Sequence, residues 1–187
     1  MFPAFCFGQI DVPIQNTSTD DNVTYRLFAT PNDYTFIKLD TRNGLMWQVQ
    51  WSIKGYKYRY ETELNTFKYA KTTKEITEYQ TKKYKSDYEY WEERKEEWYK
   101  KKSDTTLTEK DFYYKTEEEL DLYLKPNPLE ESIKRALENS PIARNGRFFL
   151  YPTVNTYNLI LLDQIDGRAW QVQWNNDKDL RRLMRIN

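Results

Sequence analysis

Two aspartates, Asp40 and Asp163, are the first candidates for acid–base chemistry. They occupy the same place in two segments of similar sequence, four residues before a glycine. A symmetric pair of carboxylates could act as general acid and general base. Each aspartate also opens a predicted hairpin loop, where a carboxylate commonly accepts backbone hydrogen bonds. The position favours this structural role over the catalytic one.

The rest of the composition argues against catalysis. The chain of 187 residues has no histidine and one cysteine, Cys6. The usual general base and the Ser-His and Cys-His nucleophile pairs are therefore missing, as are an internal disulfide and a cysteine-based zinc site. We predict no catalytic residue, no cofactor and no metal site, and a protein that is not an enzyme. Four glutamates are typical of a solvated helix face and are assigned no metal: Glu92, Glu93, Glu96 and Glu97.

Tryptophans that alternate with glutamines are candidates for binding sugar rings. The alternating residues are Trp47, Trp51, Trp170 and Trp174, with Gln48, Gln50, Gln171 and Gln173 between them. Tryptophans at strand spacing usually belong to a core. We therefore predict that the four tryptophans form structural core and that the glutamines lie on a solvated face.

Tyrosines supply a candidate interaction surface. Tyrosine is common in interfaces because an apolar ring carries a polar hydroxyl. We assign five tyrosines to this surface: Tyr56, Tyr58, Tyr60, Tyr88 and Tyr90. The alternative is ordinary packing along an edge strand and a helix, with each hydroxyl in water.

Charge and hydropathy exclude two further classes. Lys and Arg number 29, as do Asp and Glu, so the formal net charge is zero. A nucleic-acid binder normally shows a basic field, and we predict no nucleic-acid partner. No apolar run approaches the ~20 residues of a membrane span. Aromatic residues make up 17% of the chain, which is enough to build a core.

The strongest signal is a distant internal repeat. Residues 34–51 and 157–174 are identical at ten of eighteen positions, with a constant offset of 123. Both segments end in Trp-Gln-Val-Gln-Trp, the period-two pattern of a strand with one buried face. Both carry a hairpin glycine, Gly44 or Gly167. Further upstream, Arg26-Leu27-Phe28 aligns by residue type with Arg147-Phe148-Phe149, which requires a two-residue difference in loop length.

Each copy is predicted to form a β-meander, over residues 23–65 and 145–187. The last strands are expected near 56–61 and 180–186. A lone meander exposes one apolar face, and two copies can bury these faces against each other. We therefore predict an α+β protein with two homologous antiparallel meanders, packed as a small sandwich or barrel about a pseudo-twofold axis.

Between the copies, residues 66–141 are predicted to be a helical insertion. The apolar period changes to about 3.6 over 71–103, where aromatic residues fall on one side of a helical wheel. The spacing of capping boxes occurs at 108–111 and at 116–119. A last helix is predicted to follow, capped by Asn127.

The first ten residues allow two interpretations. Residues 1–10 are apolar and end in Gly8-Gln9, as the end of a bacterial signal peptide does, but the basic start is missing. A remnant of a signal peptide would place the protein in the periplasm or outside the cell. Otherwise the phenylalanines of this segment pack into the core, and the protein is cytoplasmic or associated with a virion.

The second copy resembles a known module. The run RFFLYPTVNTYNLILLDQIDGRAWQVQW is similar to a short β-module of uncharacterised small proteins from Bacteroidota and their phages and mobile elements. The first copy departs from it, with Ala-Thr-Pro-Asn in place of Leu-Tyr-Pro-Thr. The resemblance covers residues 25–60 and 145–186 and not the helical part. It implies a bacterial or phage source and a β fold, and it implies no activity.

These observations lead to one functional prediction and one alternative. We predict a non-catalytic structural or protein-interaction module that binds a protein partner or associates with itself, with no small-molecule ligand identified. The alternative is a carbohydrate-binding or carbohydrate-processing envelope protein that uses exposed Trp and Tyr side chains. Burial of the four tryptophans would remove the main support for the alternative, whereas exposure of several in one groove would favour it.

Overall fold

The computed structural model describes residues 22–187 and confirms the α+β class. The chain divides into a β unit, whose described part is 22–70 and 143–187, and a helical unit, 71–142. The predictions for residues 1–10 lie outside the described range. Within that range, no helix combines the length and the apolar character needed to cross a membrane.

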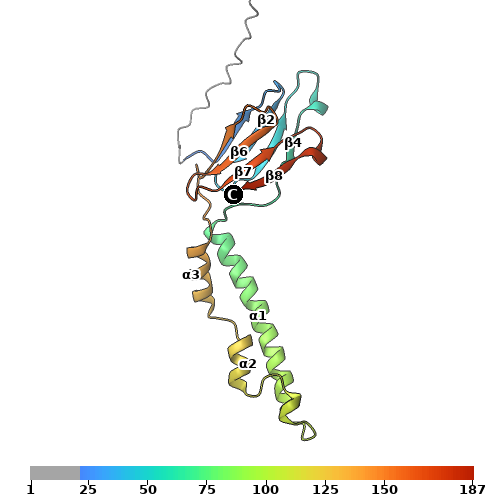
Figure 1. The fold of residues 1–187 in the computed structure, drawn as a ribbon, viewed down its shortest axis with the longest axis vertical. Coiled ribbons are helices and arrows are strands. Elements are labelled where there is room, and N and C mark those ends of the chain that lie inside the picture. Colours follow the sequence, from blue (N-terminus) through green and yellow to red (C-terminus); the bar gives the residue numbers. More distant parts are fainter. Residues whose placement is uncertain (1–21) are drawn as a thin grey trace, which may run out of the picture. The chain divides into compact units, whose positions relative to one another are not determined.

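The β unit contains two four-stranded antiparallel meanders (Figure 1). The first sheet consists of β1 (Tyr25–Ala29), β2 (Thr35–Asp40), β3 (Met46–Gln50) and β4 (Tyr60–Glu63). The second consists of β5 (Phe148–Pro152), β6 (Asn158–Asp163), β7 (Ala169–Gln173) and β8 (Arg182–Ile186). The sheets do not close into a barrel. Residues 56–58, predicted as strand, form a one-turn 3-10 helix before β4, and 178–180 do the same before β8.

Strand pairing extends the repeat further than residue similarity does. Asp40 of β2 lies opposite Tyr25, and Asp163 of β6 lies opposite Phe148. The offset of 123 therefore runs through β1 and β5 without interruption. The predicted two-residue difference in loop length is wrong, because it matched arginines that do not occupy equivalent positions in the paired strands.

The two copies form the same meander but bury opposite faces of it: the side of a strand that is buried in one copy is the outward side of the equivalent strand in the other. In β2 the buried side chains include Ile37 and Leu39, whereas in β6 they are those of Leu159 and Leu161. With the offset of 123, the second pair corresponds to residues 36 and 38, which are half-buried. Successive side chains in a strand point to opposite faces, so a change of one residue means a change of face.

The third strand of each copy shows the same exchange. Met46 and Gln48 are buried in β3, whereas Trp170 and Val172 are buried in β7. A twofold axis would bring the same face of both copies into contact. The predicted pseudo-twofold packing is therefore wrong, and the inner face of the first sheet meets the opposite face of the second.

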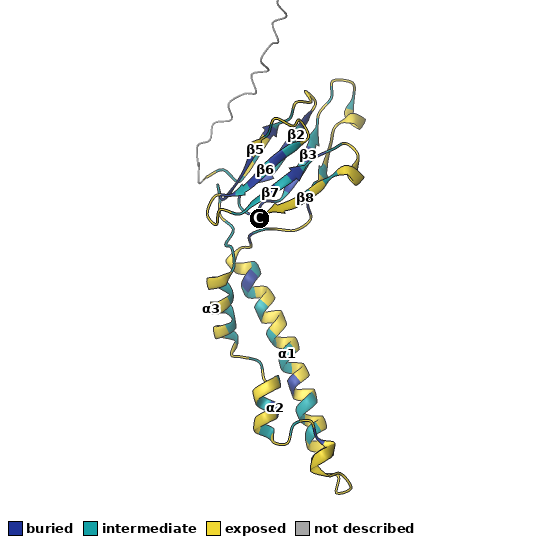
Figure 2. Cartoon of the chain, viewed as in Figure 1, coloured by how far each residue is buried: buried dark blue, intermediate teal, exposed yellow. Residues whose placement is uncertain are grey.

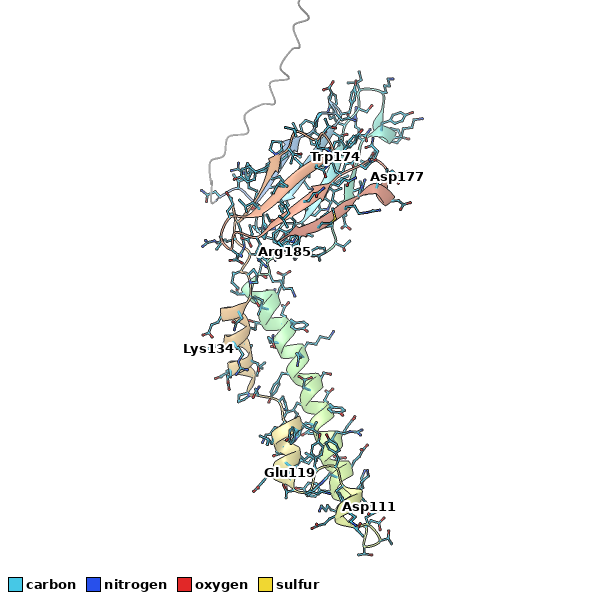
Figure 3. All side chains as sticks on the ribbon, in the orientation of Figure 1. Asp111, Glu119, Lys134, Trp174, Asp177 and Arg185 are labelled. Carbon is cyan, nitrogen blue, oxygen red and sulfur yellow. The ribbon has the colours of Figure 1, made fainter. Side chains whose placement is uncertain are left out.

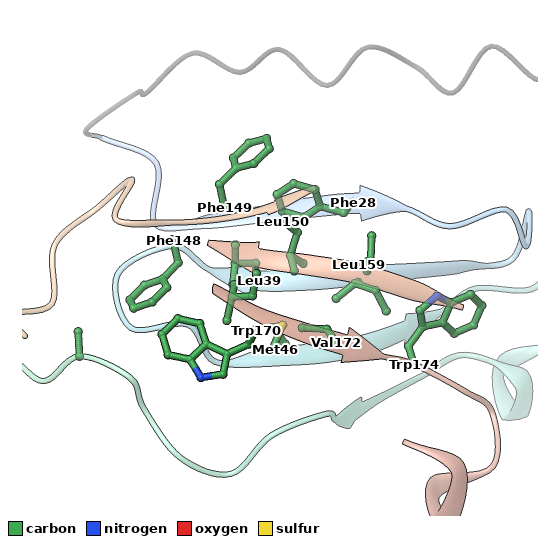
Figure 4. Packing of buried hydrophobic residues seen from close by; sticks show 13 residues of the cluster. Phe28, Leu39, Met46, Phe148, Phe149, Leu150, Leu159, Trp170, Val172 and Trp174 are labelled. Atoms are coloured by element: carbon green, nitrogen blue, oxygen red, sulfur yellow. The ribbon is translucent and has the colours of Figure 1, made fainter. Parts of the chain in front are cut away.

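One hydrophobic core fills the space between the sheets (Figure 4). The first sheet contributes Phe28, Ile37, Leu39 and Met46, and the second contributes Phe148, Leu150, Leu159, Leu161, Trp170, Val172 and Trp174. Phe149 points away from Leu150 on β5 but is also buried, because its ring lies edge-on to Phe28 at 5.1 Å. Ala70 belongs to the same cluster.

The helical unit has three α-helices (Figure 2): α1 (Thr73–Lys102), α2 (Glu117–Leu124) and α3 (Leu129–Asn139). Trp91 is buried in this unit, and its indole N–H donates to Asp121 of α2 over 2.9 Å. The predicted helices are thus confirmed in position, and the aromatic side of α1 contacts α2.

The helix ends only partly follow the predictions. The capping box at 108–111 is present, with a 3-10 turn over Glu109–Asp111. Figure 3 labels Asp111, the last residue of this box, and Glu119 of the second predicted box. At the second box Thr116 accepts the N–H of Glu119, but the Glu119 carboxylate bonds the backbone of residue 115 instead. Asn127 does not cap α3, since position 128, a proline without a side-chain acceptor, is the N-cap.

Candidate functional site

The outer face of the first sheet is the candidate site. It is the side opposite the core, and strand pairing defines its members, since directly opposed residues of an antiparallel pair share a face. Lys38 lies opposite Trp47, and the same pairing joins Phe36 to Val49. Strand pairing and alternation place Tyr25, Leu27, Ala29, Phe36, Lys38, Trp47, Val49, Glu61 and Glu63 on the outer face of the first sheet, and Trp51 continues the alternation of β3 on the same side.

A paired lysine lies over one tryptophan of this face. The Lys38 ammonium is 4.5 Å from the centre of the Trp47 ring and forms an ion pair with Glu61. An ammonium over an indole face is attracted by the ring electrons. The charge of Lys38 is thus compensated twice within the face, and the remaining surface is largely apolar.

The second tryptophan of the face is open to solvent. Trp51 is 43% exposed, its indole N–H donates to the Asp33 carbonyl over 2.8 Å, and its ring lies 5.3 Å from that of Tyr34. These contacts fix the orientation of the ring. Trp51 therefore presents a preorganised apolar surface.

The burial of the four tryptophans differs between the copies. Trp170 and Trp174 are 6% and 3% exposed, which confirms them as core residues (Figure 4). For Trp51 the prediction of burial is wrong, and Trp47 is half-buried outside the core cluster. The cause is the exchange of faces, which turns the tryptophan side of the first copy outwards.

The same exchange of faces turns Gln48 into the core. It was expected on a solvated face, but it is fully buried between the sheets. Its amide donates to Asn176 over 2.7 Å, and its carbonyl oxygen accepts from the Arg181 guanidinium over 2.9 Å. Both polar ends of the buried side chain are thereby satisfied by the second copy. The other three glutamines are half-buried: Gln50, Gln171 and Gln173.

The two aspartates lie at the start of their hairpin loops, and each forms ion pairs with arginine side chains. Asp40 is buried and bonded to Arg42 over 2.8 Å. Asp163 is buried and accepts from Arg147 and Arg168 over 2.8 and 2.9 Å. Burial raises the pKa of Asp163, but the arginine hydrogen bonds outweigh it and leave the pKa below its ordinary value. A carboxylate held ionised in this way is structural, and the geometry does not support an acid–base pair.

The five tyrosines are divided between the two units. Tyr56, Tyr58 and Tyr60 are exposed on the β unit, in the 3-10 turn and β4. Tyr90 is exposed on α1, whereas Tyr88 is half-buried, with its ring 5.1 Å from that of Trp91. Tyr56 and Tyr58 precede β4, whereas Tyr60 is its first residue and donates its hydroxyl to Gln50.

No cluster in residues 22–187 has the composition of a metal site, which requires three or more acidic or thiol ligands in the absence of histidine. The glutamates at 92, 93, 96 and 97 are exposed along α1.

Comparisons of the chain with protein-family models, curated proteins and solved structures found no match.

Proposed function

We propose that the β unit is a non-catalytic protein-binding module that acts through the outer face of the first sheet. One observation carries this proposal: the Trp-Val-Trp side that forms the core of the second copy is turned outwards in the first. Trp47, Val49 and Trp51 are therefore residue types already suited to pack against a protein sheet.

The physical reason is the apolar area left in water. Exposed contiguous apolar surface rimmed by polar groups marks interaction sites in soluble proteins. The face has such a rim, because Glu61 and Glu63 line its β4 side. Tryptophan is also enriched among the residues that dominate binding energy.

The test is capture of partners by the full chain from lysates of Bacteroidota and their phages, the source that the resemblance of the second copy suggests. Val49→Lys places a charge at the centre of the face, opposite Glu61, where the sheet itself tolerates it. The matched control is Val154→Lys, at a fully exposed loop position. We expect the same proteins with wild type and control, and their loss with Val49→Lys. Identical capture by all three would contradict the proposal.

The second candidate, carbohydrate binding, is favoured by one observation, the exposed ring of Trp51 beside Tyr34. Against it, the lysine over Trp47 covers the other ring that a sugar would need. Affinity electrophoresis in gels that contain polysaccharides separates the two functions. Retardation of the wild type that is lost in Trp51→Ala would support carbohydrate binding.

A further inference from the structure

The second sheet also has an outer face. Strand pairing places on it Tyr151, Asn158, Ile160, Leu162, Ala169, Gln171, Gln173, Arg182, Met184 and Ile186, and also Phe149, whose ring is buried against Phe28. Met184 and Ile186 are 47% and 45% exposed. The outer face of the second sheet is apolar at Ile160, Leu162, Met184 and Ile186 and polar at one end, where Asn158, Gln173 and Arg182 lie. Near its centre, the Gln171 amide donates to Asn158 over 2.8 Å, which leaves the Gln171 carbonyl oxygen to accept a further bond.

The two outer faces repeat the two surfaces that already pack together inside the molecule. Ile160 and Leu162 are equivalent to the buried Ile37 and Leu39, and Gln171 is equivalent to the buried Gln48. On the first sheet, Trp47, Val49 and Trp51 are equivalent to the buried Trp170, Val172 and Trp174. The contact inside the molecule joins the Ile-Leu-Gln surface of the first sheet to the Trp-Val-Trp surface of the second. The Trp-Val-Trp surface of the first sheet and the Ile-Leu-Gln surface of the second remain on the outside.

We propose that a second copy of this chain occupies the outer face of the first sheet, with the outer face of its second sheet. This inference rests on the proposed function and names the partner. The contact between molecules would reproduce the contact between the copies: Trp-Val-Trp on one side, Ile-Leu-Gln on the other.

An arginine is already placed to complete the polar part of this contact. In the internal interface Arg181 donates to Gln48, while its Nε donates to the Asn175 carbonyl over 2.9 Å. In the first copy Arg59 has the same anchor, since its Nε donates to the Ser52 carbonyl over 3.0 Å. Arg59 of one molecule would therefore donate to Gln171 of the next.

The departures from the internal interface are compatible with stacking. Lys38 stands where the second copy has the buried Leu161, but its charge is paired with Glu61. The fourth strands carry opposite charges, with Glu63 on the outer face of the first sheet and Arg182 on the same side of the second sheet as Met184. Opposite charges favour this pairing over contact between two identical faces.

Because the two faces differ, the association is head to tail. Such a heterologous contact leaves a free face at each end and continues into rings or open chains of molecules. A contact between identical faces would instead stop at a dimer. This difference makes the mode of association measurable.

Sedimentation velocity of the full chain over a range of concentrations tests the proposal. We expect wild type and Val154→Lys to form oligomers larger than dimers, at low salt and at about 0.5 M salt, since an apolar contact resists screening. Val49→Lys and Met184→Lys each block one face and should both be monomeric. An equimolar mixture of the two variants retains one intact pair of faces and should form a dimer that does not grow. Arg59→Ala should weaken the association about tenfold.

Three results would overturn stacking. A wild type that is monomeric at every concentration contradicts it, while capture of other proteins that depends on Val49 would leave the proposed function intact. Self-association of Met184→Lys shows that the outer face of the second sheet is not used. A mixture that stays monomeric, with circular dichroism and melting of both variants like wild type, excludes the head-to-tail contact. If Val49→Lys melts early, Leu27→Lys on the same face replaces it.

Discussion

Trp51 and Trp174 make the same local contacts and differ in what covers them. Each indole N–H donates to the carbonyl before a tyrosine, over 2.8 Å for Trp51 and 3.1 Å for Trp174. Each ring lies beside that tyrosine, at 5.3 and 5.5 Å. Yet the exposed fractions are 43% and 3%. The meander therefore folds alike in both copies, and only the packing of the sheets separates them.

This pair yields the first prediction. Trp174→Ala should lower the free energy of unfolding by about 3–5 kcal/mol, the usual cost of truncating a core aromatic residue. Trp51→Ala should cost about 1 kcal/mol, because it loses one hydrogen bond and little burial. Urea unfolding at low protein concentration, where association does not contribute, measures both. Equal costs would show that the two positions are packed alike.

The second prediction concerns acid stability. The folded-state pKa of Asp163 is below its ordinary value, so the ionised carboxylate stabilises the fold at neutral pH. This contribution is complete above about pH 5 and is lost as the pH falls through the lowered pKa. We expect Asp163→Asn to be less stable than wild type at pH 7 and to differ less from it near pH 2–3. Urea unfolding at several pH values is the measurement, with the exposed Asp179→Asn as control. A difference that is independent of pH would contradict the assigned role.

The third prediction compares two hairpin glycines. Gly44 and Gly167 both have positive φ angles, 78° and 69°. A Cβ on Gly44 would come within 2.6 Å of the Tyr69 ring, whereas one on Gly167 would meet nothing within 4 Å. Both alanine variants are destabilised by about 1–2 kcal/mol of backbone strain, but Gly44→Ala must also displace the Tyr69 ring. Its thermal midpoint should fall further than that of Gly167→Ala. Equal shifts would mean that Tyr69 yields freely.

The fourth prediction concerns the insertion. The Lys71 N–H donates to the Pro141 carbonyl over 3.0 Å, so the ends of the helical unit lie side by side. Replacing 71–142 with a short flexible linker should leave a cooperatively melting β unit. Replacing 66–142 should destabilise it strongly, because this also removes Ala70 and Tyr69, whose ring lies 4.3 Å from that of Trp170. Calorimetry distinguishes the two, and equal melting would show that these residues do not belong to the core.

Local features of the fold could be predicted from the sequence. The spacing of apolar residues and the turn residues between them, within about ten positions, determine where hairpins and helices form. Gly44 and Gly167 accordingly mark the loops that the structure shows. The choice of buried face could not be predicted from the Trp-Gln-Val-Gln-Trp run, because that run is identical in both copies. The available signal was the preceding strand, where Lys38 stands opposite Trp47 and Leu161 opposite Trp170.

The candidate site was missed for the same reason. The alternating pattern correctly predicted one apolar face per strand, but a second apolar face, with Ile37 and Leu39, lies on the other side of β2. Which of the two meets the partner sheet depends on residues far away in the chain, such as Arg181 and Asn176, which bond Gln48. Such long-range pairing leaves no trace in a local window.

Because the meander can bury either of its faces, the alignment of its strands must be determined by something other than the apolar pattern. If β3 slipped by one residue against β2, Trp47 and Val49 would replace Met46 and Gln48 on the inner face, so hydrophobicity alone does not oppose the slip. The loops must then decide. The Asp40 carboxylate accepts the N–H of Arg42, and the Asp40 carbonyl accepts that of Gly44, which holds the loop at one length. The Asp40 contacts thus fix the length of the loop and with it the residues of β2 and β3 that lie opposite each other.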